Sequence, residues 1–301
     1  TNPVTNIAII YNEKTRYHYD QYKRDNYINL LREITEPLLN SGNPVRFISN
    51  VNLAITSLEP YKALLLPESS GFSENELAII KNYAKNGGIV LITGDALSYE
   101  ADGSPRKDFA LNNIMGVSRE EKAEALKKVD SKQTQDKNLI DSRIVIRDNA
   151  MPVKTQATNK NWTMVIPLSG STISFIHNGE KQYPMVHVNP YGKGFVYYIA
   201  SSEMPEVTAA VLNYAGIRSP VKNNDISTLS ILRKRINKNE WFVDLLDSGS
   251  YSLVIDKKYC TATKIVDTYP AGMKDVQIKF TKDSILIHVN NQNDFSTLVL
   301  Q

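Results

Sequence analysis

Apolar residues in the first two hundred positions alternate between short continuous runs and runs at helical spacing. Residues 7–11 and 89–93, and residues 63–66 within the segment 61–66, form nearly continuous apolar runs, which are typical of strands covered on both faces. Between them, apolar residues recur every three or four positions over 27–39 and 77–84, as in amphipathic helices. Strand, helix and strand in this order predict right-handed crossovers and a doubly wound, mostly parallel sheet.

Local signals sharpen the helix boundaries. Ser73 followed three residues later by Glu76 predicts a capping box, and the glycine pair at 87–88 predicts the end of that helix. Pro37 interrupts the preceding helical pattern and is expected to kink or restart it. Residues 12–25, which are polar and rich in tyrosine, are interpreted as a loop.

The periodicity weakens after residue 117. Short apolar segments at 144–146, 164–166 and 173–176 predict a β-rich insertion near 118–183. Regular order then returns, with strands at 185–188 and 195–200 joined by a glycine-containing turn. A helix that starts at Pro205 and stops at Gly216 follows.

From residue 217 onward no helical period survives. Apolar residues lie in short, roughly alternating segments between Gly, Asp and Asn turns, which predicts a small antiparallel β-sandwich. Residues 219–224 are interpreted as the linker. The predicted domains are therefore 1–218 (α/β) and 219–301 (β-sandwich).

Composition excludes several classes of protein. With 35 Lys and Arg against 32 Asp and Glu, the formal net charge is +3, which gives no sign of a nucleic-acid footprint. The longest apolar runs are strand-sized, so no membrane span is predicted. Cys260 is the one cysteine, which excludes an internal disulfide and a cysteine-based zinc site without fixing the compartment.

Two polar segments follow predicted strands, and ligands bind at the carboxyl ends of strands in open α/β sheets. The first is the predicted loop after the first strand, which carries one basic and three aromatic residues: Arg16, Tyr17, Tyr19 and Tyr22. Tyrosine offers an apolar face with a polar tip, so this loop is a candidate for sugar stacking or for a protein interface. The alternative is a loop packed under another domain.

The second segment carries Asp95, Tyr99 and Glu100. Paired carboxylates can hydrolyse glycosides, but neighbours on one turn rarely supply the opposed pair that such chemistry needs, so no catalytic residue is assigned. The turn 94–96 also holds neither Cys nor Ser where an α/β enzyme would place a nucleophile. The four histidines lack metal-ligand spacing and are interpreted as structural, so no metal or cofactor is predicted.

Several of these segments, in their order along the chain, carry a family resemblance. They are 61–67 (YKALLLP), 87–90 (GGIV), 99–103 (YEADG), 114–117 (IMGV), 184–186 (PMV), 192–198 (GKGFVYY) and 241–247 (WFVDLLD). This order resembles the β-galactosidase trimerisation domain and the C-terminal domain that follows it in family 42 glycoside hydrolases. The resemblance implies an amidotransferase-like α/β fold that mediates subunit contacts, and an upstream barrel with two catalytic carboxylates.

A barrel of about 250 residues does not fit beside the segments already assigned. The sequence therefore favours a non-catalytic C-terminal portion of a glycoside hydrolase. It would serve subunit or domain assembly, with its own subunits or an upstream barrel as partners, and could shape a carbohydrate site. The alternative is a free-standing carbohydrate- or protein-binding module. An amidotransferase-like enzyme is a third reading, disfavoured by the missing nucleophile.

Overall fold

The computed structural model describes residues 2–22, 27–120, 162–178, 181–223, 229–235, 238–273 and 275–301. The chain forms two compact units. The β unit comprises Thr1–Ile7, Glu36–Arg46 and Arg218–Gln301, and the α/β unit comprises Ala8–Thr35 and Phe47–Ile217. The first residues of the chain therefore group with its C-terminal part.

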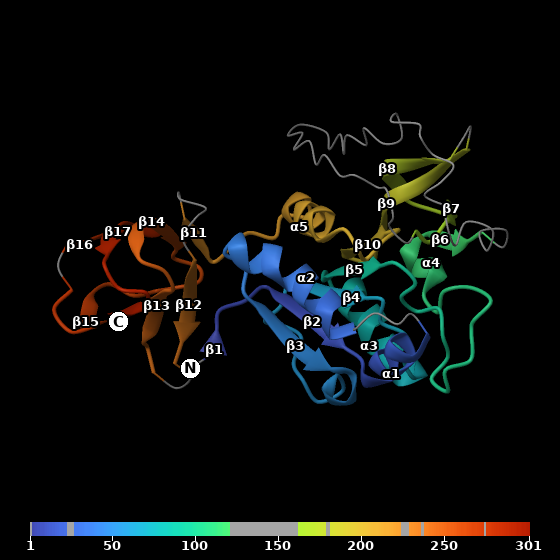
Figure 1. The fold of residues 1–301 in the computed structure, drawn as a ribbon, viewed down its shortest axis with the longest axis horizontal. Coiled ribbons are helices and arrows are strands. Elements are labelled where there is room, and N and C mark those ends of the chain that lie inside the picture. Colours follow the sequence, from blue (N-terminus) through green and yellow to red (C-terminus); the bar gives the residue numbers. More distant parts are fainter. Residues whose placement is uncertain are drawn as a thin grey trace. The chain divides into compact units, whose positions relative to one another are not determined.

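A mixed sheet forms the centre of the α/β unit (Figure 1). Its strands are Ile7–Tyr11 (β2), Val45–Ser49 (β3), Ala63–Pro67 (β4), Ile89–Thr93 (β5), Ser171–Asn178 (β8), Lys181–Tyr191 (β9) and Gly194–Ile199 (β10). Among the described residues they lie in the order β3-β2-β4-β5-β10-β9-β8. Strand β5 pairs in parallel with β4 and β10, whereas the β10–β9 and β9–β8 pairs are antiparallel. The predicted α/β class is confirmed, and antiparallel strands extend one side of the sheet.

Burial on both faces explains why the continuous apolar runs form the middle of this sheet. Residues 7–10, 63–66 and 90–92 are all at most 1% exposed. Removing this apolar surface from water is the main stabilising term in such a sheet, at roughly 25 cal/mol per Å².

The helices of the described chain are Glu13–Tyr22 (α1), Tyr27–Asn40 (α2), Glu74–Lys85 (α3), Asn112–Met115 (α4) and Pro205–Tyr214 (α5). The capping box between Ser73 and Glu76 at the start of α3 is confirmed. Leu77, Ile80 and Ala84 form its buried face, as the spacing predicted. Pro37 lies inside α2, which continues to Asn40.

The interpretation of residues 12–25 as a loop is wrong, because α1 occupies most of that segment. Asn12 supplies the start signal. Its side-chain Oδ1 accepts the backbone N–H of Lys14 at 2.9 Å and that of Thr15 at 3.3 Å, and its backbone carbonyl accepts from Arg16 N. Asparagine is among the preferred N-cap residues. The segment was interpreted as a loop because its residues are mostly polar and show no apolar helical spacing.

The segment predicted as an insertion is only partly described. Strands Val117–Arg119 (β6) and Val165–Pro167 (β7) form an antiparallel pair, close to the strand predicted at 164–166. The strand predicted at 173–176 is part of β8, which belongs to the main sheet through its pairing with β9. The strand predicted at 144–146 lies outside the described residues. The turn between β9 and β10 is a hairpin turn, as predicted.

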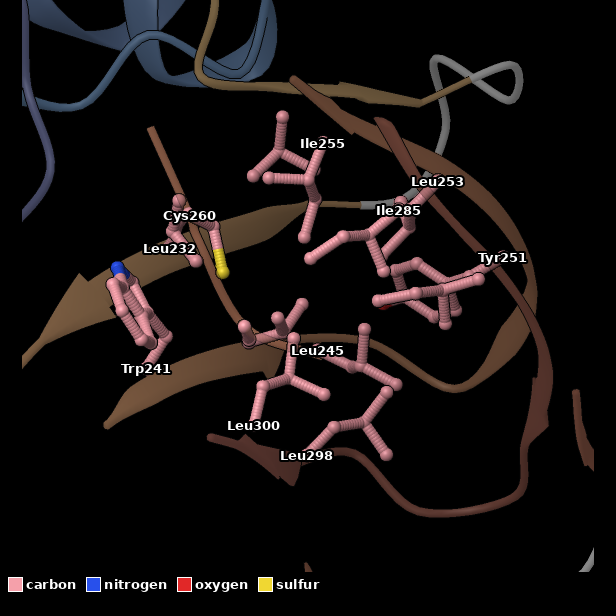
Figure 2. Packing of buried hydrophobic residues seen from close by; sticks show 14 of the residues in the cluster. Leu232, Trp241, Leu245, Tyr251, Leu253, Ile255, Cys260, Ile285, Leu298 and Leu300 are labelled. Carbon is pink, nitrogen blue, oxygen red and sulfur yellow. The ribbon is translucent and has the colours of Figure 1, made fainter. Parts of the chain in front are cut away.

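The β unit contains two antiparallel sheets, which confirms the antiparallel character predicted for the C-terminal part. Its strands are Asn2–Pro3 (β1), Val221–Asn223 (β11), Ser230–Lys234 (β12), Trp241–Leu245 (β13), Gly249–Asp256 (β14), Ile265–Tyr269 (β15), Val276–Phe280 (β16), Ser284–Asn291 (β17) and Ser296–Leu300 (β18). The described strands have the order β1-β12-β13-β18-β15 in one sheet and β11-β14-β17-β16 in the other. Figure 2 shows side chains from both sheets, such as Trp241 and Tyr251, in one buried cluster.

Two features of the β unit differ from the sequence interpretation. Strand β1, from the very start of the chain, pairs with β12. Strand β11 lies within the segment interpreted as a linker, where Val221 is buried and pairs with Ile255 of β14. Both segments are too short to show periodicity, so only their long-range partners define them as strands.

Candidate functional site

The first group of candidate residues lies on a helix. Arg16 and Tyr17 are exposed on α1, with 79% of Tyr17 accessible to solvent. Tyr19 and Tyr22 belong to the same helix, but their side chains lie outside what the structure describes. A tyrosine exposed to this degree contributes nothing to the core of its own unit, so it is available for contact with another molecule.

Helix α1 is held in place by a buried threonine. Thr15 Oγ1 donates to the backbone carbonyl of Ser70 at 2.9 Å and accepts the N–H of Ser70 at 2.8 Å. Ser70 belongs to the segment that follows β4. Strand β4 ends next to β5, so α1 and the loop after β5 lie at the same edge of the sheet.

Asp95, the central residue of the second candidate group, is engaged in an internal network. Its Oδ1 lies 3.0 Å from Arg119 Nη2 and accepts a hydrogen bond from Thr163 Oγ1 at 3.2 Å. Its backbone N–H donates to Glu68 Oε2 at 3.1 Å. Asp95 therefore ties the end of β5 to two segments that are distant in sequence.

Glu68, which has no strong signal in the sequence, is the buried member of this network. It is 8% exposed and has a backbone φ of 50°, a left-handed conformation that is uncommon for glutamate. Ser202 Oγ donates to its Oε1 at 2.7 Å. Gly94 lies so close that a Cβ built on it would be 1.9 Å from Glu68 Oε1. The position of Glu68 directly after a buried strand that ends in Pro67 is the one sequence signal for its role.

A buried phenol completes the network. Tyr198 Oη donates to the carbonyl of Gly94 at 3.1 Å. Burial raises the pKa of Tyr198 well above its ordinary value, and the negative charges of Asp95 and Glu68 act in the same direction. The phenol therefore stays protonated, and it serves as a fixed donor under the turn.

Asp108 positions the arginine that pairs with Asp95. Its carboxylate accepts hydrogen bonds from Ser118 Oγ at 2.7 Å, Asn112 Nδ2 at 2.8 Å and the backbone N–H of Arg119 at 3.0 Å. Burial alone would raise the pKa of Asp108, but these hydrogen bonds outweigh it and lower the pKa below the ordinary value. The ionised carboxylate thus holds the start of β6 against α4.

Tyr99 and Glu100 belong to a turn that Arg106 closes. The Arg106 guanidinium forms an ion pair with Glu100 and lies 3.8 Å from Glu74 Oε1 at the start of α3. Its Nε also donates to the Tyr99 carbonyl at 3.4 Å. The carboxylates predicted as a poor catalytic pair thus have structural partners.

Three exposed apolar residues on and after β3 were not predicted from the sequence. Phe47, Val51 and Ile55 are 45%, 65% and 83% exposed, and they follow one another along β3 and the turn after it. Asn50 Nδ2 donates to Glu76 Oε1 at 2.9 Å, which fixes this turn against the start of α3. The sequence signal was the spacing of Val51 and Ile55, two large apolar residues four positions apart directly after β3. We call Arg16, Tyr17, Phe47, Val51 and Ile55 the strand-end face.

The histidines have different surroundings. His187 is buried, with Nδ1 3.0 Å from Thr172 Oγ1 and Nε2 2.6 Å from the Ser169 carbonyl, and burial lowers its pKa. It is structural, as expected. His288 is instead exposed, with Nδ1 2.9 Å from Ser252 Oγ. The side chains of His18 and His177 lie outside what the structure describes.

Two other kinds of site are absent from the described residues. In those ranges no group of three or more His, Cys, Asp or Glu side chains is placed to hold a metal ion. Across the same part of the chain, no helix is both long enough and apolar enough to cross a membrane.

Residues 5–221 match the family model described as the beta-galactosidase trimerisation domain. A comparison with curated proteins found no match. A comparison with solved structures found a similar fold in several proteins. A catalytic mutant of a GH42 beta-galactosidase from G. stearothermophilus is similar with a TM-score of 0.66 and 16% identity, covering 100% of this chain.

Two further solved structures show the same fold. The beta-galactosidase from Bacillus circulans sp. alkalophilus has a TM-score of 0.62 at 13% identity, and 99% of this chain is covered. Alpha-L-fucosidase isoenzyme 2 from Paenibacillus thiaminolyticus has a TM-score of 0.65 at 11% identity, again with 99% covered. The match covers 41%, 42% and 49% of these three structures, in the order given, so this chain spans less than half of each.

Proposed function

Because this chain belongs to the β-galactosidase trimerisation domain family, we propose that it is the non-catalytic C-terminal portion of a longer glycoside hydrolase and serves in subunit assembly. The family match over residues 5–221 is the observation that carries this proposal. The similar GH42 beta-galactosidase is more than twice as long as the matched region. The proposal therefore places a catalytic barrel elsewhere in the whole protein, with that barrel and the protein's own subunits as partners.

The proposal includes the finer details of the predicted fold. We take 1–218 as a doubly wound, amidotransferase-like α/β domain with an insertion near 118–183, from which β8 joins the main sheet, and 219–301 as a β-sandwich domain to which the first residues of the chain add a strand. The parallel β4–β5 and β5–β10 pairs support the first part. The internal contacts of Asp95, Glu68 and Glu100 support a structural use of the strand ends.

The strand-end face is the surface that we assign to assembly. Tyrosine, phenylalanine and arginine are enriched at protein interfaces, and energetically dominant residues cluster in apolar centres with polar rims. Val51 and Ile55 are the most apolar exposed pair on this face, and Arg16 and Tyr17 supply polar groups. A second copy of the chain is the occupant that the family description indicates.

Self-association is expected to depend on the apolar part of this face. The wild-type chain should sediment as a trimer. A Val51→Asp, Ile55→Asp variant should associate at least about 100-fold more weakly, because two carboxylates would be desolvated at the interface. Leu168→Asp is the matched control, since Leu168 is an exposed apolar residue of the same unit outside this face. A strictly monomeric wild type, or equal weakening by Leu168→Asp, would contradict the proposal.

The chain alone is expected not to hydrolyse aryl β-galactosides. Asp95 is paired with Arg119 and Glu100 with Arg106, so neither carboxylate is placed as an acid or nucleophile opposite the other. A chromogenic assay of the purified chain would test this expectation. Turnover that disappears in Asp95→Asn or Glu100→Gln would show that these residues are catalytic after all.

A further inference from the structure

A shallow groove crosses the outer face of the four-stranded sheet in the β unit. Its volume is about 400 Å³, and residues of β14, β17 and β16 line it. These three strands are neighbours in the sheet (Figure 1). Along β14, Tyr251, Leu253 and Ile255 point into the core, so Ser252 and Val254 face outward. The volume lies in the lower part of the range for small-molecule sites.

One row of side chains across this groove consists of hydrogen-bonding groups. In the strand register Ser252 lies opposite His288, which lies opposite Gln277. Ser252 Oγ and His288 Nδ1 are 2.9 Å apart, which fixes the orientation of the imidazole. In the part of the chain that the structure describes, Nε2 of His288 has no hydrogen-bond partner. The row thus presents an imidazole, a hydroxyl and an amide, which together can donate and accept.

The neighbouring row is mainly apolar. Val254 lies opposite Leu286, and Leu286 lies opposite Lys279. Leu286 is 37% exposed, so its methyl groups form part of the floor. Each strand contributes one residue to each row, and these two residues are two positions apart, as Ser252 and Val254 are on β14. Such residues are separated by about 7 Å along the strand, so the distance between the polar row and the apolar row is close to the width of a sugar ring.

Two lysines and one ion pair carry the charges around the groove. Lys279 lines it, and Lys222 of β11 lies opposite Val254 at the end of the apolar row. Asp256, two residues beyond Val254 on β14, forms an ion pair with Lys258 at 2.7 Å. A protein interface needs roughly 800 Å² from each partner with an apolar centre, whereas the two rows offer only Val254 and Leu286 as apolar side chains. The groove therefore suits a small, hydroxyl-rich ligand.

We propose that the outer face of β14, β17 and β16 is a carbohydrate-binding groove for a short oligosaccharide. The C–H face of a sugar ring lies on Val254 and Leu286. Its hydroxyl groups exchange hydrogen bonds with Ser252, His288 and Gln277. The choice of a galactose-containing probe rests on the proposed function, but the groove itself does not.

Binding can be measured by nuclear magnetic resonance on the full chain, labelled with nitrogen-15, with β-1,4-galactotriose as the first probe and cellotriose as the second. We expect amide shifts confined to β14, β16 and β17, with a Kd on the order of 1 mM because the groove is shallow. A Gln277→Ala, His288→Ala variant should bind at least about tenfold more weakly. Asn290→Ala is the matched control, since Asn290 lies two residues from His288 on the same face of β17 and outside the groove.

Several outcomes would overturn the inference. These are no shifts with either sugar at concentrations about tenfold above the expected Kd, equal weakening by Asn290→Ala, or shifts that depend on protein concentration without sugar. The last result would identify the groove as a contact between copies. Sedimentation of the groove variants separates the two proposals. Groove variants that stay trimeric but no longer bind sugar leave the assembly proposal intact. A monomeric Val51→Asp, Ile55→Asp variant that still binds sugar leaves the groove proposal intact.

Discussion

Replacing Gly94 by alanine is expected to destabilise the α/β unit by about 3–5 kcal/mol, a large effect for one methyl group. Gly94 has a φ of 61°, where alanine costs roughly 1–2 kcal/mol. The new Cβ would lie 1.9 Å from Glu68 Oε1. The buried carboxylate would have to move away from Ser202 and from the Asp95 N–H, and losing such hydrogen bonds costs about 1–3 kcal/mol each.

Urea unfolding followed by far-ultraviolet circular dichroism would measure this loss. Gly103→Ala is the matched control, because Gly103 has a φ of 87° but no atom lies within 4 Å of the position that its Cβ would take. It should show the backbone cost alone, about 1–2 kcal/mol. In a Glu68→Ala background the steric part should vanish, so Gly94→Ala should also cost about 1–2 kcal/mol. Equal effects of Gly94→Ala and Gly103→Ala in the wild-type background would disprove the role assigned to Glu68.

The sequence predicted the elements whose signals are local. The runs at 7–11 and 89–93 are apolar at nearly every position, short and rich in β-branched residues, which is typical of a strand buried on both faces. Ser73 and Glu76 form a reciprocal pair within one turn, so their spacing alone identifies the start of α3. The hairpin turn at 192–194 was recognised for the same reason.

Features that depend on distant partners could not be predicted. Nothing in residues 2–3 indicates a strand until β12 is placed beside them. Glu68 looks like a surface residue until Ser202, 134 positions away, donates to its carboxylate. The two rows of the groove likewise arise from the register of β14, β17 and β16, which periodicity alone does not determine.

In the candidate site too, the positions set by local signals were predicted and the contacts with distant residues were not. The sequence placed Asp95, Tyr99 and Glu100 at one edge of the sheet because they follow a predicted strand, and the structure has them there. It did not reveal that Arg119 and Arg106 pair with two of them, since arginines at these spacings carry no local signal. Of the strand-end face, which we propose as the assembly surface, the sequence indicated Arg16 and Tyr17 but not Val51 and Ile55.

Replacing Asp244 by alanine is expected to destabilise the β unit by about 2–4 kcal/mol. Asp244 is 4% exposed in the middle of β13, yet it carries a charge. Its carboxylate accepts hydrogen bonds from Arg233 Nε, from Arg233 Nη2 at 2.7 Å and from Thr297 Oγ1 at 2.8 Å. It thereby joins the side chains of β12, β13 and β18, three neighbouring strands. Alanine would leave both donors without this acceptor.

Unfolding monitored by the fluorescence of Trp241, three residues away on β13, would measure this effect in a Trp162→Phe background, which removes the second tryptophan of the chain. Thr297→Val removes one hydrogen bond and should cost about 1 kcal/mol, and Asp244→Asn, which keeps an acceptor oxygen but loses the charge, should fall between the two. Asp267→Ala is the control, because Asp267 is an exposed carboxylate on β15 and should change stability by less than about 0.5 kcal/mol. If Asp244→Ala matched Asp267→Ala, the network across β12, β13 and β18 would not contribute to the stability of the β unit. A loss near the middle of the expected range, with the two intermediate variants in order, would show that one buried carboxylate holds the three strands together.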